Sequence, residues 1–336
     1  MSLPSTATGP AAASASPGAS STASIQHLPV NLFAAVMGLA GLALAWRVAA
    51  KTLGADIAIA DAIGVLAILV FLLITGGYLF KLARYPDAVR REFAHPVASN
   101  FFGTITIAIL LLSAIVDRYS AALQQAVWTL GVISTIALGF LMVHRLLSGN
   151  AAPAGAVPAW LIPGVATLDI AVTGATMPMA WAGQANLLAV AIGSVLAVVY
   201  FVMIFSRLVH GEPLPAGMTP SLMILMAPFE VGFLAYLNLV QQVDLFAAVL
   251  FYFGLFLFAV LSLRVFRRSI PFAASWWAIG FPLAALANAA LKYADATGGA
   301  VLTVLAAALL AFLSAAIAVL LVRTLHALFS GKLLKA

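Results

Sequence analysis

The chain lacks cysteine altogether and carries very little charge. Among its 336 residues there is no Cys, and Asp, Glu, Lys and Arg together make up only 8%. The first absence excludes disulfide bonds, thiolate nucleophiles and cysteine-ligated metal sites. The second excludes an ordinary water-soluble surface, because soluble domains carry about 25% charged residues. Since 64% of the residues are hydrophobic, much of the apolar surface is expected to face lipid.

Sequence motifs of common enzyme classes are also absent. There is no GxxxxGK(S/T) phosphate-binding loop, no HExxH zinc motif and no GxSxG nucleophile elbow. We therefore expect neither enzymatic activity nor ATP-driven pumping by this chain alone, and no cofactor or metal. The net charge of +6 suggests nucleic acid at first sight, but the basic residues lie in short loops between apolar runs. There they act as topology signals, so nucleic acid is not an expected partner.

Long apolar runs are what the sequence has in abundance. A helix needs about 20 apolar residues to cross a bilayer, and ten runs approach or exceed that length. They are 30–49, 57–80, 97–116, 121–147, 160–176, 185–209, 219–240, 245–266, 272–294 and 299–328. We predict an all-α polytopic membrane protein in which residues 27–336 form ten transmembrane helices. Residues 1–26, which are rich in Ala, Ser, Pro, Thr and Gly, are expected to be a disordered tail.

Lysine and arginine residues indicate the orientation. With ten spans, both termini lie on the same side of the membrane, and that side would hold twelve of the sixteen basic residues. The other side would hold Arg47, Lys51, Arg118 and Lys292. The positive-inside rule then places both termini in the cytoplasm. We expect a plasma-membrane protein, which in bacteria means the inner membrane.

Proline separates the spans into two classes. Pro163, Pro228 and Pro282 lie inside spans five, seven and nine. Pro29 and Pro96 lie at the starts of spans one and three, and the even-numbered spans contain no proline. Because proline leaves a backbone carbonyl without its partner, broken helices are tolerated at membrane depth only inside protein or beside a water-filled cavity. We infer that the odd spans line a central cavity and the even spans face lipid; the alternative is that the prolines merely serve helix packing.

The spacing of the odd spans points to a repeated unit. They begin near residues 30, 97, 160, 219 and 272, so that successive starts lie 67, 63, 59 and 53 residues apart. Each interval holds one odd and one even span, which corresponds to a helical hairpin. The chain is therefore expected to fold as five hairpins around a central pore.

Ionisable and polar side chains at membrane depth also favour the odd spans. Glu230 stands two residues after a proline in an otherwise apolar span, where a charge is costly and a functional role is the default. We hypothesise that Glu230 is protonated during transport or forms an ion pair that closes the pore; a structural hydrogen bond between inner helices is the alternative. Asp169, Thr104 and Asn288 are further pore-lining candidates, and for Asp169 a packing hydrogen bond is the alternative.

Basic residues near the ends of the spans have two interpretations. Lys292 lies near the outer end of span nine with Asp295 three residues further on, and a local ion pair is the interpretation we favour. Arg84, Arg90 and Arg91 follow span two. They are candidates for concentrating anions at the inner mouth of a pore, although topology alone accounts for them.

Six stretches resemble one protein family and occur in its order. They are HLPVNLFAAVMGLAGLALAW at 27–46, REFAHPVASNF at 91–101, PAWLIPGVA at 158–166, LMAPFEVGFLAYL at 225–237, WWAIGFPLAALAN at 276–288 and LFSGKLLKA at 328–336. The chain resembles the tellurite-resistance/dicarboxylate transporter family, which includes the bacterial TehA proteins and the plant guard-cell slow anion channels. The resemblance implies five hairpins whose odd helices surround a largely apolar pore, in members that are typically homotrimers. It also implies that Phe281, in WWAIGFPLAALAN, is the phenylalanine that gates the pore.

Three functional hypotheses follow. The first is a passive anion channel for small anions such as chloride or nitrate, gated by Phe281. The second is a secondary transporter of dicarboxylates such as malate, coupled to protons through Glu230, or a tellurite-related exporter; bacterial relatives carry an apolar residue where Glu230 stands. The third is an intramembrane enzyme or a structural membrane subunit, and the dispersed polar residues of the odd spans argue against the enzyme.

Overall fold

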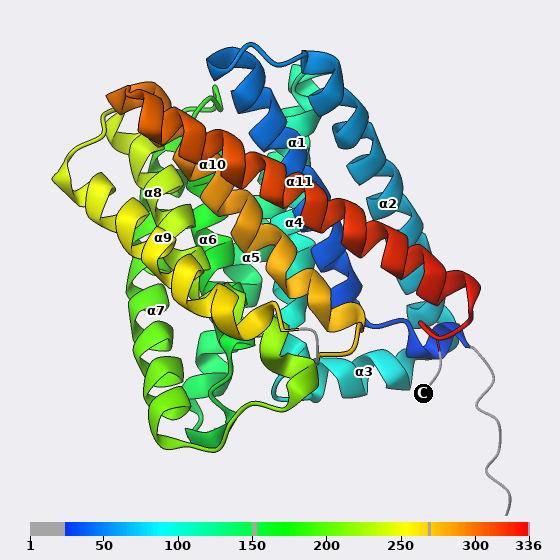
Figure 1. Cartoon of the computed structure of the whole chain (residues 1–336). Helices are drawn as coiled ribbons and strands as arrows, with labels where there is room; N and C mark the ends of the chain where they lie inside the picture. Colours follow the sequence, from blue (N-terminus) through cyan, green and yellow to red (C-terminus); the bar gives the residue numbers. More distant parts are fainter. Residues whose placement is uncertain (1–23, 150–152, 268–269, 335–336) are drawn as a thin grey trace, which may run out of the picture.

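The molecule is built from helices packed side by side (Figure 1). The computed structural model describes residues 24–149, 153–267 and 270–334, and within them there are α-helices and 3-10 helices but no strands. The α-helices are α1 (Ala34–Thr52), α2 (Ile57–Arg84), α3 (Pro86–Ala94), α4 (Gly103–Val116), α5 (Ala121–Leu147), α6 (Leu161–Gly174), α7 (Ala182–His210), α8 (Ala227–Val240), α9 (Leu245–Val265), α10 (Gly280–Thr297) and α11 (Ala300–Phe329). The tail expected at 1–26 lies outside the described residues up to residue 23, and Ile25–His27 forms a short 3-10 helix, η1.

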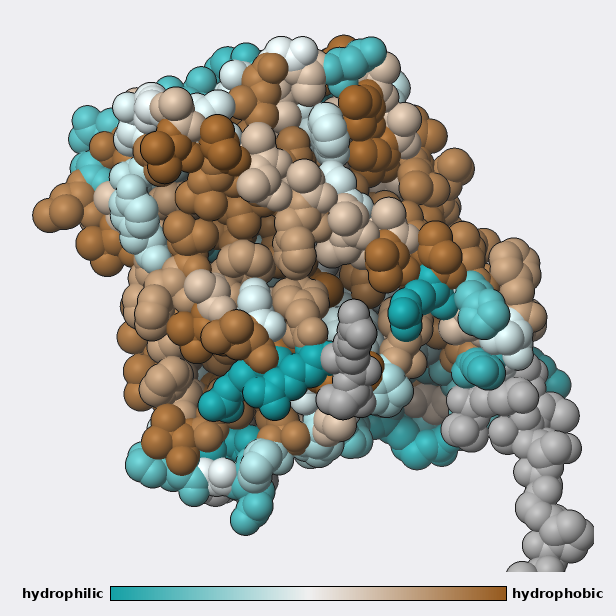
Figure 2. Space-filling view, viewed as in Figure 1, coloured by the Kyte–Doolittle hydropathy of each residue, from teal (hydrophilic) through white to brown (hydrophobic). Residues whose placement is uncertain are grey.

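The described residues contain nine helical segments that are long and apolar enough to cross a membrane. Their bounds lie within a few residues of nine of the expected spans. The remaining expected span, 160–176, corresponds to the shorter apolar helix Pro158–Gly174. Figure 2 shows hydrophobic residues over the middle of the visible face and hydrophilic residues gathered toward its ends. The chain is therefore a multi-pass membrane protein.

The short helix α3 is the element that the search for apolar runs misses. It has nine residues, a proline at its start, Asp87 in its first turn and Arg91 in its last turn. Proline at the first position and charges that complement the helix dipole are local helix signals. The helix lies across the end of the bundle instead of along it (Figure 1). A segment this short and polar cannot be a membrane span.

The long helices fall into two classes that differ in burial. In the spans containing α1, α4, α8 and α10, 61–78% of the most apolar window is buried, against 22–33% for α2, α5, α7, α9 and α11. Helix α1 packs against α4, α4 against α6, α6 against α8, α8 against α10, and α10 back against α1. We call α1, α4, α6, α8 and α10 the inner helices and the other five the outer helices. The division of odd from even spans that proline predicts is thus also a division of buried from exposed helices.

Each inner helix begins with a 3-10 segment. These segments are η2 (Val30–Phe33) before α1, η3 (Ala98–Phe102) before α4, η5 (Pro158–Trp160) before α6, η6 (Ala216–Met226) before α8 and η7 (Ala274–Ile279) before α10. They contact one another in the same closed order as the inner helices. Pro163, Pro228 and Pro282 lie in the first turns of α6, α8 and α10, directly after the 3-10 segments, and proline is tolerated in the first turn of an α-helix. The prolines therefore mark junctions between 3-10 and α segments, which revises their expected role as breaks within a span.

The two ends of the described chain meet at one face of the molecule, which we call the terminal face. The N–H of Ser24 donates to the carbonyl of Leu334 at 3.0 Å. Close by, the Lys81 ammonium contacts Glu92 Oε2 at 2.6 Å and the Leu28 carbonyl at 2.8 Å. The other Glu92 oxygen accepts a 2.8 Å hydrogen bond from the N–H of Val30. This ion pair ties α2 and α3 to the start of the first inner helix.

Candidate functional site

Two cavities lie inside the ring of inner helices. The lower cavity, toward the terminal face, has a volume of about 30 Å³. The upper cavity, toward the opposite face, has a volume of about 150 Å³. Every residue that lines them belongs to an inner helix or to the 3-10 segment before it. Among the described residues, Phe281 is the one that borders both cavities.

The position of Phe281 follows from a close approach of α1 and α10. A Cβ built on Gly280 would lie 3.3 Å from the Cα of Gly38, so the absence of side chains lets the two backbones come together at this level. Phe281 is only 7% exposed. On the same helix face, one to three turns above it, lie Ala285, Asn288 and Lys292, which line the upper cavity.

The lower cavity is almost wholly apolar. Its walls are mainly Ala, Ile, Val, Met and aromatic side chains. The Thr104 hydroxyl, which borders it, donates to the Phe101 carbonyl at 2.6 Å and is therefore already satisfied. The first turns of all five inner α-helices supply lining residues: Ala34, Thr104, Ile162, Ala227 and Phe281. These turns continue directly from the 3-10 segments, whose carbonyls accept the first N–H group of each inner α-helix, so the helix N-termini lie at the starts of the 3-10 segments and not at this narrow, water-repelling space.

The upper cavity contains polar side chains from three inner helices. Asp169 is 1% exposed, and its Oδ2 has no hydrogen-bond partner. Asp169 Oδ2 therefore does not make the packing hydrogen bond that is the alternative to a pore-lining role. Asn288 donates to the carbonyls of Gly41 at 3.1 Å and Ala284 at 2.8 Å, which fixes its amide against α1. An ion entering this cavity would meet both side chains.

Lys292 corrects one expectation. Its ammonium lies 3.5 Å from Asn238 Oδ1 on α8, and no ion pair joins it to Asp295. The reason is that the side chain extends along the cavity wall toward α8, where an oxygen is available, instead of back over its own helix. Arg47 also borders this cavity, and its guanidinium pairs with Asp117 at 2.9 Å.

Glu230 lies outside both cavities, which corrects its expected place in the pore lining. The side chain is fully buried, and both carboxyl oxygens lack a hydrogen-bond partner. A Cβ built on Gly254 of α9 would overlap Glu230 Oε1, so the carboxyl lies in the seam between α8 and α9. Val231, the next residue, lines the upper cavity. Successive helix residues point about 100° apart, which turns Glu230 away from the cavity and into the seam.

The remaining candidates divide in the same way. Pro282 borders the lower cavity, whereas Pro163 and Pro228 border neither. Arg84, Arg90 and Arg91 are exposed at the end of α2 and on α3. Arg90 pairs with Asp87 at 3.2 Å.

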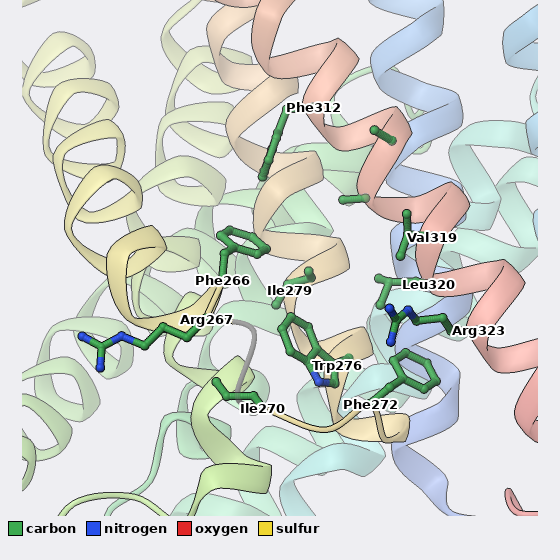
Figure 3. A pocket seen from close by; sticks show the side chains of 12 residues that line it. Phe266, Arg267, Ile270, Phe272, Trp276, Ile279, Phe312, Val319, Leu320 and Arg323 are labelled. Carbon is green, nitrogen blue, oxygen red and sulfur yellow. The ribbon is translucent and has the colours of Figure 1, made fainter.

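A larger hollow of about 570 Å³ lies outside the ring, between the end of α9, η7 and α11 (Figure 3). Four aromatic and six aliphatic side chains line it together with two arginines, and the Arg323 guanidinium lies 5.9 Å from the centre of the Phe272 ring. The Arg267 side chain points away from the hollow in Figure 3. None of its lining residues borders either inner cavity, so it is not continuous with the space around Phe281.

Several known proteins are similar to this chain in sequence. Residues 27–325 match the model of the SLAC1 family, described as voltage-dependent anion channel. The chain belongs to this family. It is 28% identical to the S-type anion channel SLAH2 of Arabidopsis thaliana over 81% of this chain and 54% of that protein. It is 27% identical to a TehA tellurite resistance homolog of Haemophilus influenzae over 79% of this chain and 81% of that protein.

A third relative is similar in length to this chain. An uncharacterized transporter of Methanocaldococcus jannaschii is 25% identical over 93% of this chain and 98% of its own length. By contrast, the chain spans about half the length of the plant channels SLAH2 and SLAH3, 54% and 48% respectively. Residues 27–325, which match the family model, contain all five inner helices and therefore both cavities.

Sequence reasoning missed the contribution of Arg47 and misjudged Lys292. Their common signal is helical spacing, since Lys292 lies eleven residues after Phe281 and thus on the same helix face. Arg47 follows Leu44 by three residues, and both line the upper cavity. Once Phe281 was chosen, following the same face of α10, and the face of α1 opposite it, would have identified these two cations.

Proposed function

We propose that the chain is a passive anion channel whose pore runs through the two cavities and is closed by Phe281. The observation that carries the proposal is that Phe281 is shared by both cavities, one toward each face of the molecule. The small anions expected to pass are chloride and nitrate. Family membership supports anion transport, since relatives are named S-type anion channels.

The proposed topology is ten membrane helices arranged as five hairpins around the pore. The contacts of each inner helix with the outer helix that follows it support the hairpins. The 3.0 Å hydrogen bond between Ser24 and Leu334 supports the number, because a chain whose ends meet on one side crosses a bilayer an even number of times. Nine long spans then require Pro158–Gly174 as the tenth. The positive-inside rule supports a cytoplasmic terminal face; the bacterial inner membrane is the proposed location and a homotrimer the proposed assembly.

Conduction would rest on weak contacts with the pore wall. An anion in the lower cavity would meet mainly apolar side chains, which keep binding weak. Weak binding suits a channel, because an ion that is held tightly does not leave. Phe281 would close the path by filling it and by keeping the apolar stretch beside it dry.

The test is voltage-clamp recording of the purified protein in planar bilayers under anion substitution. Phe281→Ala should carry at least about tenfold more chloride current than the wild type, since each tenfold step corresponds to only about 1.4 kcal/mol of barrier. Phe140→Ala, on an exposed face of α5, is the matched control and should behave as wild type. Equal currents from Phe281→Ala and Phe140→Ala, with both proteins folded, would reject the gate.

Asp169 favours a second candidate function, proton-linked transport of dicarboxylates. A buried carboxyl without a hydrogen-bond partner in the upper cavity is a place where a proton could be carried along the path. Saturable malate uptake into proteoliposomes that is driven by a proton gradient, without single-channel currents, would favour the carrier. Glu230 loses this role because its carboxyl borders neither cavity.

A further inference from the structure

Lys292 holds a positive charge at the upper end of the cavity without an anionic partner. The four ion pairs among the described residues do not include it. Within the described part of the chain, the polar side-chain contact of its ammonium is the Asn238 oxygen at 3.5 Å. A partly buried ammonium that lacks a counter-ion carries a desolvation cost that a nearby negative charge offsets. The side chain lines the cavity, so the missing charge could reach it from within.

Asn238 is oriented so that it assists the ammonium. Its Nδ2 donates to the carbonyls of Val172 at 2.7 Å and Ala171 at 3.1 Å, both in the last turn of α6. With the amide nitrogen held by α6, the amide oxygen faces Lys292. An ammonium has three donors, and this contact occupies one of them. The other two remain for a ligand or water.

Ionisable side chains from three inner helices border the upper cavity. Lys292 and Arg47 are basic, and Asp169 is acidic. Arg47 is paired with Asp117, and Asp295 is exposed. Among the described residues Lys292 forms no ion pair with any of these carboxylates, so an anion in the cavity would be its negatively charged partner.

We propose that Lys292, positioned by Asn238, coordinates a small monovalent anion at the upper end of the cavity. This inference rests on the proposed function, because it makes the upper cavity part of the conduction path. The site raises the local anion concentration above Phe281 by electrostatic focusing. A single ammonium contact keeps the affinity low enough for release. Specificity for anions over cations then arises here, and the barrier to flow arises at Phe281.

The first experiment measures chloride conductance against chloride concentration in the Phe281→Ala background. Lys292→Gln should raise the half-saturating concentration about fivefold or more and lower the chloride-to-sodium permeability ratio, because one charge-assisted contact is lost. Lys292→Arg keeps the charge and should stay within about twofold. Lys332→Gln removes a charge at the other end of the molecule and is the matched control. If Lys292→Gln and Lys292→Arg conduct alike, the site is refuted while the channel stands.

The second experiment does not depend on conduction. Weak chloride binding broadens the chloride-35 NMR signal, and the wild-type protein and Lys292→Arg should broaden it more than Lys292→Gln at equal concentration. Size-exclusion profile and melting temperature show whether each variant is folded. Equal broadening by folded wild type and Lys292→Gln overturns the site. If Lys292→Gln loses the broadening while Phe281→Ala carries no anion current, the anion site stands and the proposed channel is rejected.

Discussion

The two cavities on either side of Phe281 differ in both size and chemistry. The lower one measures about 30 Å³, and its one hydroxyl, on Thr104, is already satisfied. The upper one measures about 150 Å³ and contains Asp169, Asn288 and Lys292. A hydrated anion could interact with polar side chains in the upper cavity, whereas the lower cavity offers it mainly apolar walls. In the proposed channel, this contrast would separate anion selection, above the phenylalanine, from the barrier, at and below it.

Removing the phenylalanine should have the largest effect, since it abolishes the boundary between the cavities. We expect a graded series in which Phe281→Ala raises chloride current at least about tenfold and Phe281→Leu, which leaves a smaller gap, raises it less. The measurement is macroscopic current per unit of surface-expressed protein in oocytes. If the current does not rise as the side chain at position 281 becomes smaller, the Phe281 ring does not separate the two cavities.

Asp169→Asn should have the next largest effect, and only at alkaline pH. An ionised carboxylate in the upper cavity opposes anions, so the wild-type current should fall as the carboxyl loses its proton on raising the pH. Asparagine cannot ionise, so the current of the variant should not fall as the pH rises. At alkaline pH the variant should carry about three times the wild-type current. Recordings between acidic and alkaline pH in the Phe281→Ala background provide the test.

The control for Asp169 is a carboxyl of equal burial outside the cavities. Glu230→Gln makes the same chemical change in the α8–α9 seam. It should preserve the wild-type dependence of current on pH. A shifted profile in Glu230→Gln, combined with an unchanged one in Asp169→Asn, would reverse the assignment of the two carboxyls.

Thr104→Val should change the current by less than about twofold, because its hydroxyl is bonded within its own helix and contributes no free donor. The substitution tests whether the lower cavity acts through its apolar walls alone. A large loss of current in the folded variant would mean that the hydroxyl contacts the ion.

Gly254→Ala should leave the current per folded channel unchanged and reduce stability instead. The added methyl would overlap the Glu230 carboxyl, and overpacking of this kind costs about 1–3 kcal/mol. Gly232→Ala is the matched control, because its nearest neighbour would be 3.9 Å away. Melting temperatures in detergent should fall for the first variant and remain close to wild type for the second.

Much of this architecture could be predicted because burial in a membrane protein selects residue types along whole helices. Apolar length gave the bounds of the long helices, and the positions of proline separated inner from outer ones. The rotation of a helix is harder to predict when it is apolar on every side. Glu230 and Val231 are neighbours in sequence, yet one faces α9 and the other faces the upper cavity. Hydrophobic periodicity, which fixes rotation in soluble helices, is absent here.

Contacts between distant segments were also beyond reach. The partner expected for Lys292 was three residues away, whereas the oxygen it approaches is on Asn238, 54 positions earlier in the chain. Local pairing rules describe an isolated helix and cannot weigh a partner that another helix supplies. The helix α3 was missed for a different reason, since its nine residues show charge and capping signals but no apolar run.

The contact between α1 and α10 also determines when the ring of inner helices can be completed during synthesis. The hydrogen bond from Asn288 to the Gly41 carbonyl joins positions 247 residues apart. At a synthesis rate of about 5–20 residues per second, roughly 12–50 s separate the appearance of its two halves. During that interval the glycine face of α1 has no α10 to cover it. The last hairpin to be synthesised is therefore the one that completes the ring. If the ribosome stalls before that hairpin, α1 remains in the bilayer without its partner helix α10.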